Sequence, residues 1–149
     1  AQLSRGLGDV YKRQSNINAA IGLAQLDSCL DKFRYKKLLS EEYIRRLKDI
    51  NQIELLDIFS ENTVNHIFPI LVKANIRDKL REFLLHSNVE TGVHYQPNHK
   101  LSFYKSNYQL PIAEELSSRV ISLPFHSLLT LSELNFIVEK IFAFFKISS

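Results

Sequence analysis

The stretch Thr91–Tyr104, TGVHYQPNHKLSFY, gathers the side chains best suited to chemistry in this sequence. It offers ring donors at His94, Tyr95 and His99, a backbone turn at Gly92 and a rigid break at Pro97. Polar aromatic side chains bind substrate oxygens, but they also close buried strand ends with their polar tips hydrogen-bonded. The residues alone therefore predict either a corner that faces a substrate or a buried strand end.

Other candidate groups are weaker. His94 and His99 lie on either side of Pro97 without a third ligand nearby, so we expect no metal site. His126 follows an extended segment and is a further candidate, whereas we interpret His66 and His86 as structural. Glycine-rich phosphate loops are absent from the sequence, so a self-contained dinucleotide site or P-loop is not expected. We interpret the carboxylates of residues 114 and 115 as a solvated helix face.

The composition limits the classes of partner. The chain has 149 residues, which suffices for one domain with a core. Its net charge is +3, and the basic residues form no concentrated patch, so we expect no nucleic-acid partner. The sequence shows neither a membrane-length apolar run nor a leader signal, so we expect a cytoplasmic protein without a membrane partner. Because Met is absent, we expect a fragment or a processed product.

The first half of the chain predicts an irregular tail, a long helix and two short strands. We expect residues 1–14 to be a non-native tail, since GDVYKRQ resembles translated adapter sequence, and residues 15–149 to be the domain. Apolar residues at helical spacing from Asn16 predict one helix of about thirty residues, well above the average length. Its charged second half keeps one apolar stripe of Leu38, Leu39, Tyr43 and Leu47. Ile53–Phe59 and His66–Lys73 predict strands.

The sequence also predicts boundaries and caps for the elements that follow. Pro69 cannot donate to a ladder, which predicts an edge strand or a bulge. Asn75 and Asp78 predict the cap of a helix that ends at Asn88, and a strand is predicted over Val89–Tyr95. A further helix is predicted over Leu110–Ile121, with Ala113, Leu116 and Val120 inside. Thr130 and Glu133 predict a capping box before a last helix, whose apolar face consists of Leu134, Ile137, Val138, Ile141, Phe142 and Phe145. This order is typical of an α+β domain with a short antiparallel or mixed sheet.

Four segments, in this order, resemble the DegT/DnrJ/StrS group of sugar aminotransferases. SNINAAIGLAQLDSCLDKF (Ser15–Phe33) is similar to its R-[ML]-x-[DN]-[IL]-x-A-A-[IL]-G-x-x-Q-L helix, and residues 66–72 fit its H-[LI]-[FY]-x-[IV] strand. Thr91–Tyr104 is similar to its TGVHY-x-P-x-H segment, and RVISLPFHSLLT (Arg119–Thr130) to its R-x-LSLPLHP-x-LT segment. Each segment is a weak signal by itself, and the four together are specific.

The resemblance implies the small C-terminal domain of a fold-type I enzyme that depends on pyridoxal phosphate. Such enzymes are homodimers and use a Schiff-base lysine; here the amino group of glutamate or glutamine would pass to a nucleotide-linked keto-sugar. By the resemblance, His94, Tyr95, His99 and His126 would bind the sugar nucleotide, and Gly92 would let the backbone turn toward the cleft.

The same resemblance implies that the catalytic and cofactor-binding residues are missing from this chain. In the family, the Schiff-base lysine and the aspartate that binds the pyridine ring lie upstream of the helix that begins at Asn16. The family's Y-N-x-R stretch is replaced by Tyr11–Lys12–Arg13–Gln14, which lacks the asparagine. We therefore expect that this chain alone cannot transaminate. Two alternatives stay open: a sugar dehydratase of the same superfamily, and a non-catalytic interaction module that docks through its first helix.

Overall fold

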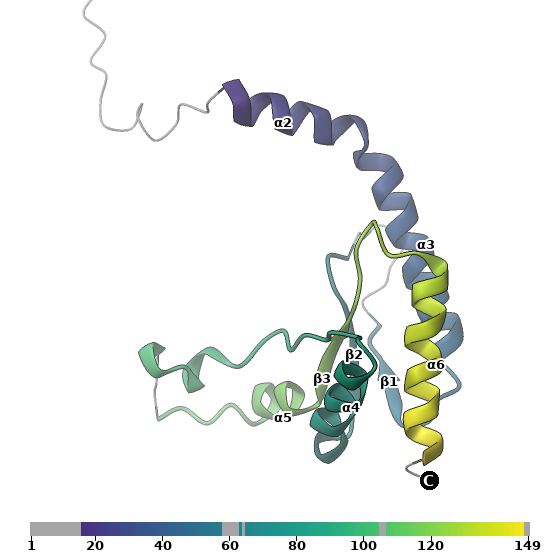
Figure 1. Cartoon of the computed structure of the whole chain (residues 1–149). Coiled ribbons are helices and arrows are strands. Elements are labelled where there is room, and N and C mark those ends of the chain that lie inside the picture. The colour runs from purple at the N-terminus through teal and green to yellow at the C-terminus, as the bar shows by residue number, and fades with distance from the viewer. Residues whose placement is uncertain (1–15, 58–62, 64, 105–106, 148–149) are drawn as a thin grey trace, which may run out of the picture. The chain divides into compact units, whose positions relative to one another are not determined.

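A computed structural model of the chain describes residues 16–57, 63, 65–104 and 107–147 (Figure 1). The chain forms two compact units, residues 1–34 and 35–149. The elements, in order, are α2 (Asn16–Asp27), α3 (Cys29–Leu47), β1 (Ile53–Leu55), β2 (Phe68–Val72), α4 (Ala74–His86), the short helices η1 (Asn98–Lys100) and η2 (Ser102–Tyr104), α5 (Pro111–Arg119), β3 (Val120–Leu123) and α6 (Leu131–Ile147). The predicted α+β class is confirmed. The expected tail, residues 1–14, lies outside the described residues.

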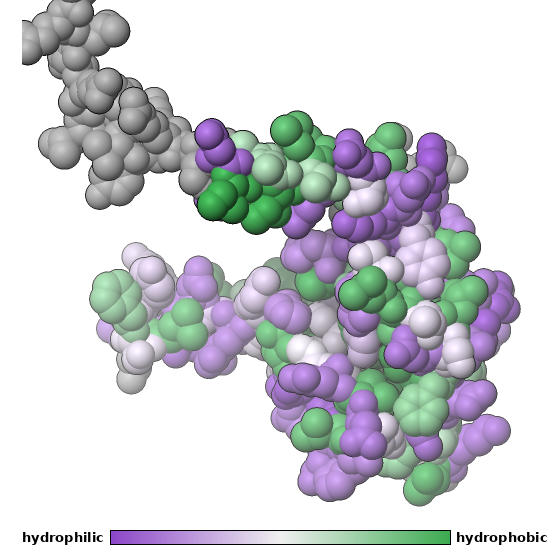
Figure 2. Space-filling model, turned by 45° about the horizontal axis from the view of Figure 1, so that its top comes forward, coloured by the Kyte–Doolittle hydropathy of each residue, from purple (hydrophilic) through white to green (hydrophobic). Residues whose placement is uncertain are grey.

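The expected long helix is interrupted at Ser28, between α2 and α3. The Ser28 hydroxyl donates to the carbonyl of Gln25 at 3.3 Å, a local bond of the kind that competes with regular helix geometry. α2 has no buried residue, and its apolar side chains gather in a green surface along the helix in Figure 2. Ile17, for example, is 72% exposed. Among the described residues, no helix has the length and apolar composition needed to cross a bilayer.

The sheet has three antiparallel strands in the order β1-β2-β3, so β2 is central and the expectation of an edge strand is wrong. Pro69 is nevertheless accommodated without a bulge. Ser122, its partner on β3, directs its backbone N–H and C=O away from β2 toward Gly92. The Pro69–Ser122 pair is therefore a non-hydrogen-bonded pair, in which no N–H is required. On its other side, β1 pairs only as far as Ile70, so Pro69 lies beyond the end of that ladder.

Two sequence boundaries around β3 are corrected by the structure. Val120 and Ile121 belong to β3 rather than to the preceding helix, because this β-branched run is buried at every position. α5 has no buried residue, so Ala113 and Leu116 are not core residues. The strand expected over Val89–Tyr95 is reduced to one bridge, Gly92 with Ser122, because it pairs with the outer edge of β3 only there.

The sequence predicted the end of α4 correctly but not its start. The helix begins at Ala74 after Lys73, which makes no side-chain cap, so the expected cap at Asn75 is wrong. The Asp78 carboxylate instead lies 2.8 Å from Nε of Arg77. The end at Asn88 is confirmed: its φ is 59°, and its N–H donates to the Leu85 carbonyl while that of Val89 donates to Leu84. This is a Schellman motif, for which Asn is one of the few suitable residues besides Gly.

One core lies within residues 35–149. Leu39, Tyr43 and Leu47 of α3 are buried at i, i+4 and i+8, whereas Leu38, expected in the same stripe, is 41% exposed because it lies about a quarter turn away. The Tyr43 ring stacks on Phe68 of β2 at 4.7 Å. On α6, Leu134, Ile137, Val138, Ile141 and Phe145 are buried as expected, but Phe144 rather than Phe142 completes the face. The Phe144 ring packs 5.5 Å from Phe83 of α4.

The capping box at the start of α6 is confirmed in both directions. The Glu133 N–H donates to the Thr130 hydroxyl oxygen at 3.2 Å, and the Thr130 N–H donates to the Glu133 carboxylate at 2.8 Å. These bonds satisfy N–H groups that have no partner within the helix. α6 therefore starts at a point fixed by its own sequence.

We expect Thr130→Ala to lower the free energy of unfolding by about 1 kcal/mol, because the N-cap acceptor is lost. Ser132→Ala, at an exposed position in the first turn of the same helix, is the matched control and should change stability by much less. Urea denaturation of the 149-residue chain measures both. Equal losses in the two variants would mean that the cap contributes nothing specific.

Candidate functional site

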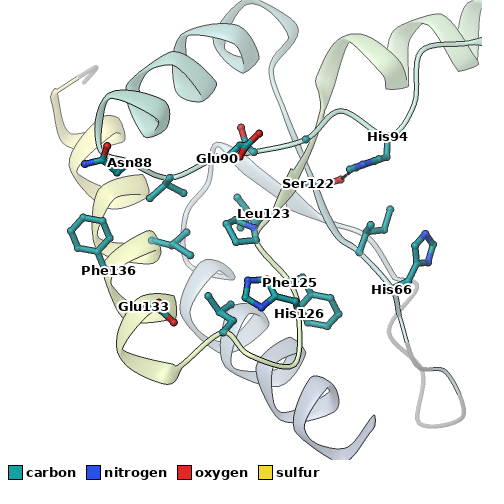
Figure 3. A pocket seen from close by; sticks show the side chains of 17 residues that line it. His66, Asn88, Glu90, His94, Ser122, Leu123, Phe125, His126, Glu133 and Phe136 are labelled. Carbon is teal, nitrogen blue, oxygen red and sulfur yellow. Dashed lines mark hydrogen bonds between the residues drawn. The ribbon is translucent and has the colours of Figure 1, made fainter. Parts of the chain in front are cut away.

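The main cleft of the described residues has a volume of about 650 Å³ and lies within the unit formed by residues 35–149. Its walls come from the segment after α4, the turn after β3 and one face of α6 (Figure 3). The polar side chains that line it are His66, Asn88, Glu90, Thr91, His94, Ser122, His126 and Glu133. Apolar residues, among them Phe136 and Ile137, line the rest. The cleft combines hydrogen-bonding groups with an apolar wall, as binding sites for small polar ligands do.

His94 is fixed on three sides. Its Nδ1 lies 3.0 Å from the hydroxyl oxygen of Ser122, and Figure 3 shows the two side chains directed toward each other. Its ring meets the Tyr95 ring edge-on, at 4.8 Å between centroids and an interplanar angle of 83°. The third contact is with Gly92. A side chain held in this way is pre-organised for binding, because little rotamer freedom remains to be lost.

Gly92 is required for a different reason from the one that the sequence suggested. No glycine among the described residues has a positive φ, so Gly92 does not provide an unusual turn. A Cβ at this position would instead lie 2.4 Å from Cε1 of the His94 ring. The Gly92 N–H donates to the Ser122 carbonyl at 3.0 Å and its carbonyl accepts from Ser122 at 2.8 Å. The missing side chain thus leaves the space that the imidazole fills.

His126 stands on the turn between β3 and α6, which two tyrosines of α3 hold in place. The Tyr43 hydroxyl donates to the Pro124 carbonyl at 2.9 Å, and the Tyr35 hydroxyl donates to the Leu129 carbonyl at 2.8 Å. His126 itself is exposed and lines the cleft. The pKa of the Glu133 carboxyl is lowered, first by hydrogen bonds from Thr130 and then by the charge of His126. His126 and Glu133 are therefore close enough to interact electrostatically.

The structure separates the other two predicted site residues from this cleft. Tyr95 is 70% exposed and lines a smaller, mostly apolar pocket of about 260 Å³. The side chain of His99 is only 9% exposed, and its Nε2 lies 3.0 Å from the Glu114 carboxylate. Lys100 binds the other oxygen of the same carboxylate at 2.7 Å. Gly92, His94 and His126 thus share one cleft, whereas Tyr95 and His99 do not face it; their roles toward a substrate stay predictions.

Sequence reasoning did not identify several residues of the cleft, among them Ser122 and His66. Ser122, which contacts His94, was treated only as part of a matching motif, and His66 was interpreted as structural although it is exposed and lines the cleft. No local sequence pattern predicts a site role for Ser122 or His66, because the other residues of the cleft come from distant segments of the chain. Glu114, expected on a solvated face, instead connects α5 to the Asn98–Lys100 turn through His99 and Lys100.

Known proteins resemble this chain in sequence and in fold. The model of the DegT/DnrJ/EryC1/StrS aminotransferase family matches residues 5–142. The chain is 33% identical over 136 residues to GDP-perosamine synthase from Escherichia coli O157:H7, covering 89% of this chain and 37% of that relative. It is also 33% identical to 3-oxo-glucose-6-phosphate:glutamate aminotransferase from Bacillus subtilis, covering 87% of this chain and 32% of that relative. The chain thus spans about a third of the length of these relatives.

Solved structures with the same fold come from the same group of proteins. Helicobacter pylori PseC, an aminotransferase involved in the biosynthesis of pseudoaminic acid, superposes with a TM-score of 0.83 at 26% identity, covering 90% of this chain and 38% of that one. The Bacillus subtilis NtdA structure, with bound cofactor PMP, gives a TM-score of 0.81 at 28% identity, covering 90% of this chain and 33% of that one. The resemblance seen in the sequence motifs is confirmed.

The cleft does not by itself fit a pyridoxal cofactor. Among the described residues that line it, there is no lysine that could form a Schiff base and no arginine that could bind a phosphate. Glu90 and Glu133 add negative charge, which opposes a phosphate group. A metal centre is not indicated either: among the described residues, no cluster of three or more His, Cys, Asp or Glu side chains could hold an ion. The cleft is suited to neutral, hydroxyl-rich ligand groups that accept hydrogen bonds.

We expect Gly92→Ala to destabilise the chain by about 1–3 kcal/mol, since the new methyl group overlaps the His94 ring. Gly22→Ala is the matched control, because nothing lies within 4 Å of the added Cβ on α2, and it should cause no loss. Urea denaturation gives both values. A tolerated Gly92→Ala variant would show that the close contact with His94 is not required.

The ionisation of Glu114 should make the stability of the folded chain depend on pH. Hydrogen bonds from Lys100, His99 and the Leu110 N–H lower the pKa of Glu114 from 4.5 to about 2. Because the folded-state pKa is depressed, its contribution is present above about pH 4.5 and is lost as the pH falls toward 2.

Glu114→Gln should therefore weaken the chain at neutral pH and flatten its loss of stability on acidification, relative to the unchanged chain. Glu41→Gln, at an exposed position on α3, serves as the control. The free energy of unfolding is measured from pH 7 to pH 2 for the unchanged chain and for both variants. This range covers the pH values over which the lowered pKa of Glu114 affects stability. Parallel curves for the unchanged chain and Glu114→Gln would contradict the assignment.

Proposed function

Because the chain belongs to the DegT/DnrJ/EryC1/StrS aminotransferase family, we propose that it is the small, cleft-bearing part of a sugar aminotransferase dependent on pyridoxal phosphate. The reaction moves an amino group from glutamate or glutamine to a nucleotide-linked keto-sugar. The observation that carries the proposal is the cleft itself. His94 and His126 both line it, and they come from the two sequence segments that we expect to bind the sugar nucleotide.

The relatives support the substrate class. One is named for a GDP-linked amino sugar, and the Bacillus subtilis relative for an oxo-sugar phosphate and glutamate. Both names contain a sugar linked to phosphate, and only the first contains a nucleotide. We accordingly assign the sugar to the cleft of this chain and leave the nucleotide base to contacts outside it. Glutamate as the donor agrees with the name of the second relative.

The residues of this chain contribute binding and orientation. The imidazoles of His94 and His126 line the cleft and provide hydrogen bonds for hydroxyl or keto oxygens. Phe136 and Ile137 supply an apolar wall that excludes water from one side of a sugar ring. Pyridoxal phosphate, when bound, supplies the electron sink for amino transfer. A Schiff-base lysine and a phosphate site for it would come from the remainder of the enzyme, which also forms the proposed homodimer.

The proposal is tested in a full-length enzyme that contains this chain. His94→Ala should lower kcat/KM for the keto-sugar about tenfold, the effect of losing roughly 1.4 kcal/mol of hydrogen bonding. His86→Ala is the matched control, since His86 lies at the end of α4, outside the cleft, with its Nδ1 bonded to the Glu82 carbonyl. Unchanged kinetics for His94→Ala would remove it from the site, and absence of any amino transfer to nucleotide-linked keto-sugars would refute the function.

A further inference from the structure

Ser122 is the buried polar residue behind His94. It is 4% exposed and lies in β3, where all four residues are buried. Its backbone N–H and carbonyl are both bonded to Gly92, at 2.8 and 3.0 Å. The hydroxyl is therefore the remaining polar group of Ser122 that needs a partner, and buried hydroxyl groups almost always have one.

The hydroxyl proton has one acceptor. Among the described residues, the Ser122 oxygen makes a hydrogen bond with His94 Nδ1, at 3.0 Å, and with no other group. If Nδ1 carried the proton of the neutral imidazole, it would donate to the serine oxygen and leave the hydroxyl proton without an acceptor among the described residues. Such an unsatisfied donor costs about 1–3 kcal/mol. The arrangement that satisfies both groups has the hydroxyl donating to an unprotonated Nδ1.

A neutral imidazole with an unprotonated Nδ1 carries its proton on Nε2. No described residue bonds to Nε2 of His94, whose side chain lines both the cleft and the smaller pocket of about 260 Å³. Gly92 closes the Cε1 edge of the ring, since even a Cβ there would lie at 2.4 Å, and the Tyr95 ring meets it edge-on. These two contacts lie beside the ring in the orientation that directs Nδ1 toward Ser122.

We propose that Ser122 is a positioning residue that holds neutral His94 as the Nε2–H tautomer. His94 then offers its Nε2–H as a hydrogen-bond donor for an acceptor oxygen of the ligand, and Nε2 does not act as a base. The identity of this ligand rests on the function proposed above, whereas the tautomer rests only on the contacts of Ser122, Gly92 and His94.

The tautomer is measured directly on the 149-residue chain labelled with ¹⁵N-histidine. Long-range ¹H–¹⁵N correlation at alkaline pH, where imidazoles are neutral, should show His94 with an unprotonated Nδ1 and a protonated Nε2. Ser122→Ala should move both nitrogen shifts toward values averaged over two tautomers, and Ser122→Thr, which keeps a hydroxyl, should restore them. Ser118→Ala is the matched control, because its hydroxyl bonds within α5 to the Glu115 carbonyl.

A protonated Nδ1 in the unchanged chain would overturn the proposal, and this result needs no variant to fold. Identical His94 shifts in the unchanged chain and a folded Ser122→Ala variant would overturn it as well. A merely structural role for Ser122 would change stability without changing the tautomer, so the two roles give different results.

The donor role is tested by titrating the same labelled chain with GDP and with GDP-mannose. Binding should shift the His94 Nε2–H resonance while Nε2 stays protonated. An equal effect of both probes assigns the acceptor to phosphate, and an effect of GDP-mannose alone assigns it to the sugar. Loss of the Nε2 proton on binding would overturn the donor role. If the tautomer is as expected but neither probe changes the spectrum, the donor role fails and the assignment of Ser122 stands.

Discussion

The pairing of Gly92 with Ser122 is the constraint on which the cleft depends. Two backbone hydrogen bonds attach the segment after α4 to the outer edge of β3 at this one point. The same two residues define the position of His94, one by its hydroxyl and the other by its missing side chain. Because the segment pairs with β3 at this single bridge, the residues that follow Gly92 leave the sheet. His94, the second of them, lines the cleft.

The opposite wall depends on α3. Tyr43 is fully buried against Phe68, and its hydroxyl still reaches the Pro124 carbonyl, while Tyr35 reaches Leu129. These bonds satisfy carbonyls of an irregular turn, which has no ladder of its own. Burial raises the pKa of Tyr43, so the hydroxyl stays a neutral donor under ordinary conditions. The turn that carries His126 is thereby attached to the same core that supports the sheet.

The charges of the cleft suggest a division of labour within the proposed enzyme. Imidazoles and small polar groups line it together with two carboxylates, and none of its described lining residues is a lysine or an arginine. Such a surface suits hydroxyl and keto oxygens better than a phosphorylated cofactor, which requires concentrated positive charge or backbone N–H groups. The chain spans about a third of its relatives' length.

The sequence by itself determined the features that depend on neighbours within a few residues. The capping box of Thr130 and Glu133 and the helix end at Asn88 are local hydrogen-bonding patterns, and both are where the sequence placed them. The family motifs likewise identified the segments that carry His94 and His126. Tertiary structure alone decided that these two imidazoles share a cleft, that Val120 and Ile121 form a strand, and that Gly92 makes room for a ring. Each of these outcomes depends on contacts between residues that are distant in the sequence and that the sheet brings together. The spacing of residues within a short segment does not predict such contacts.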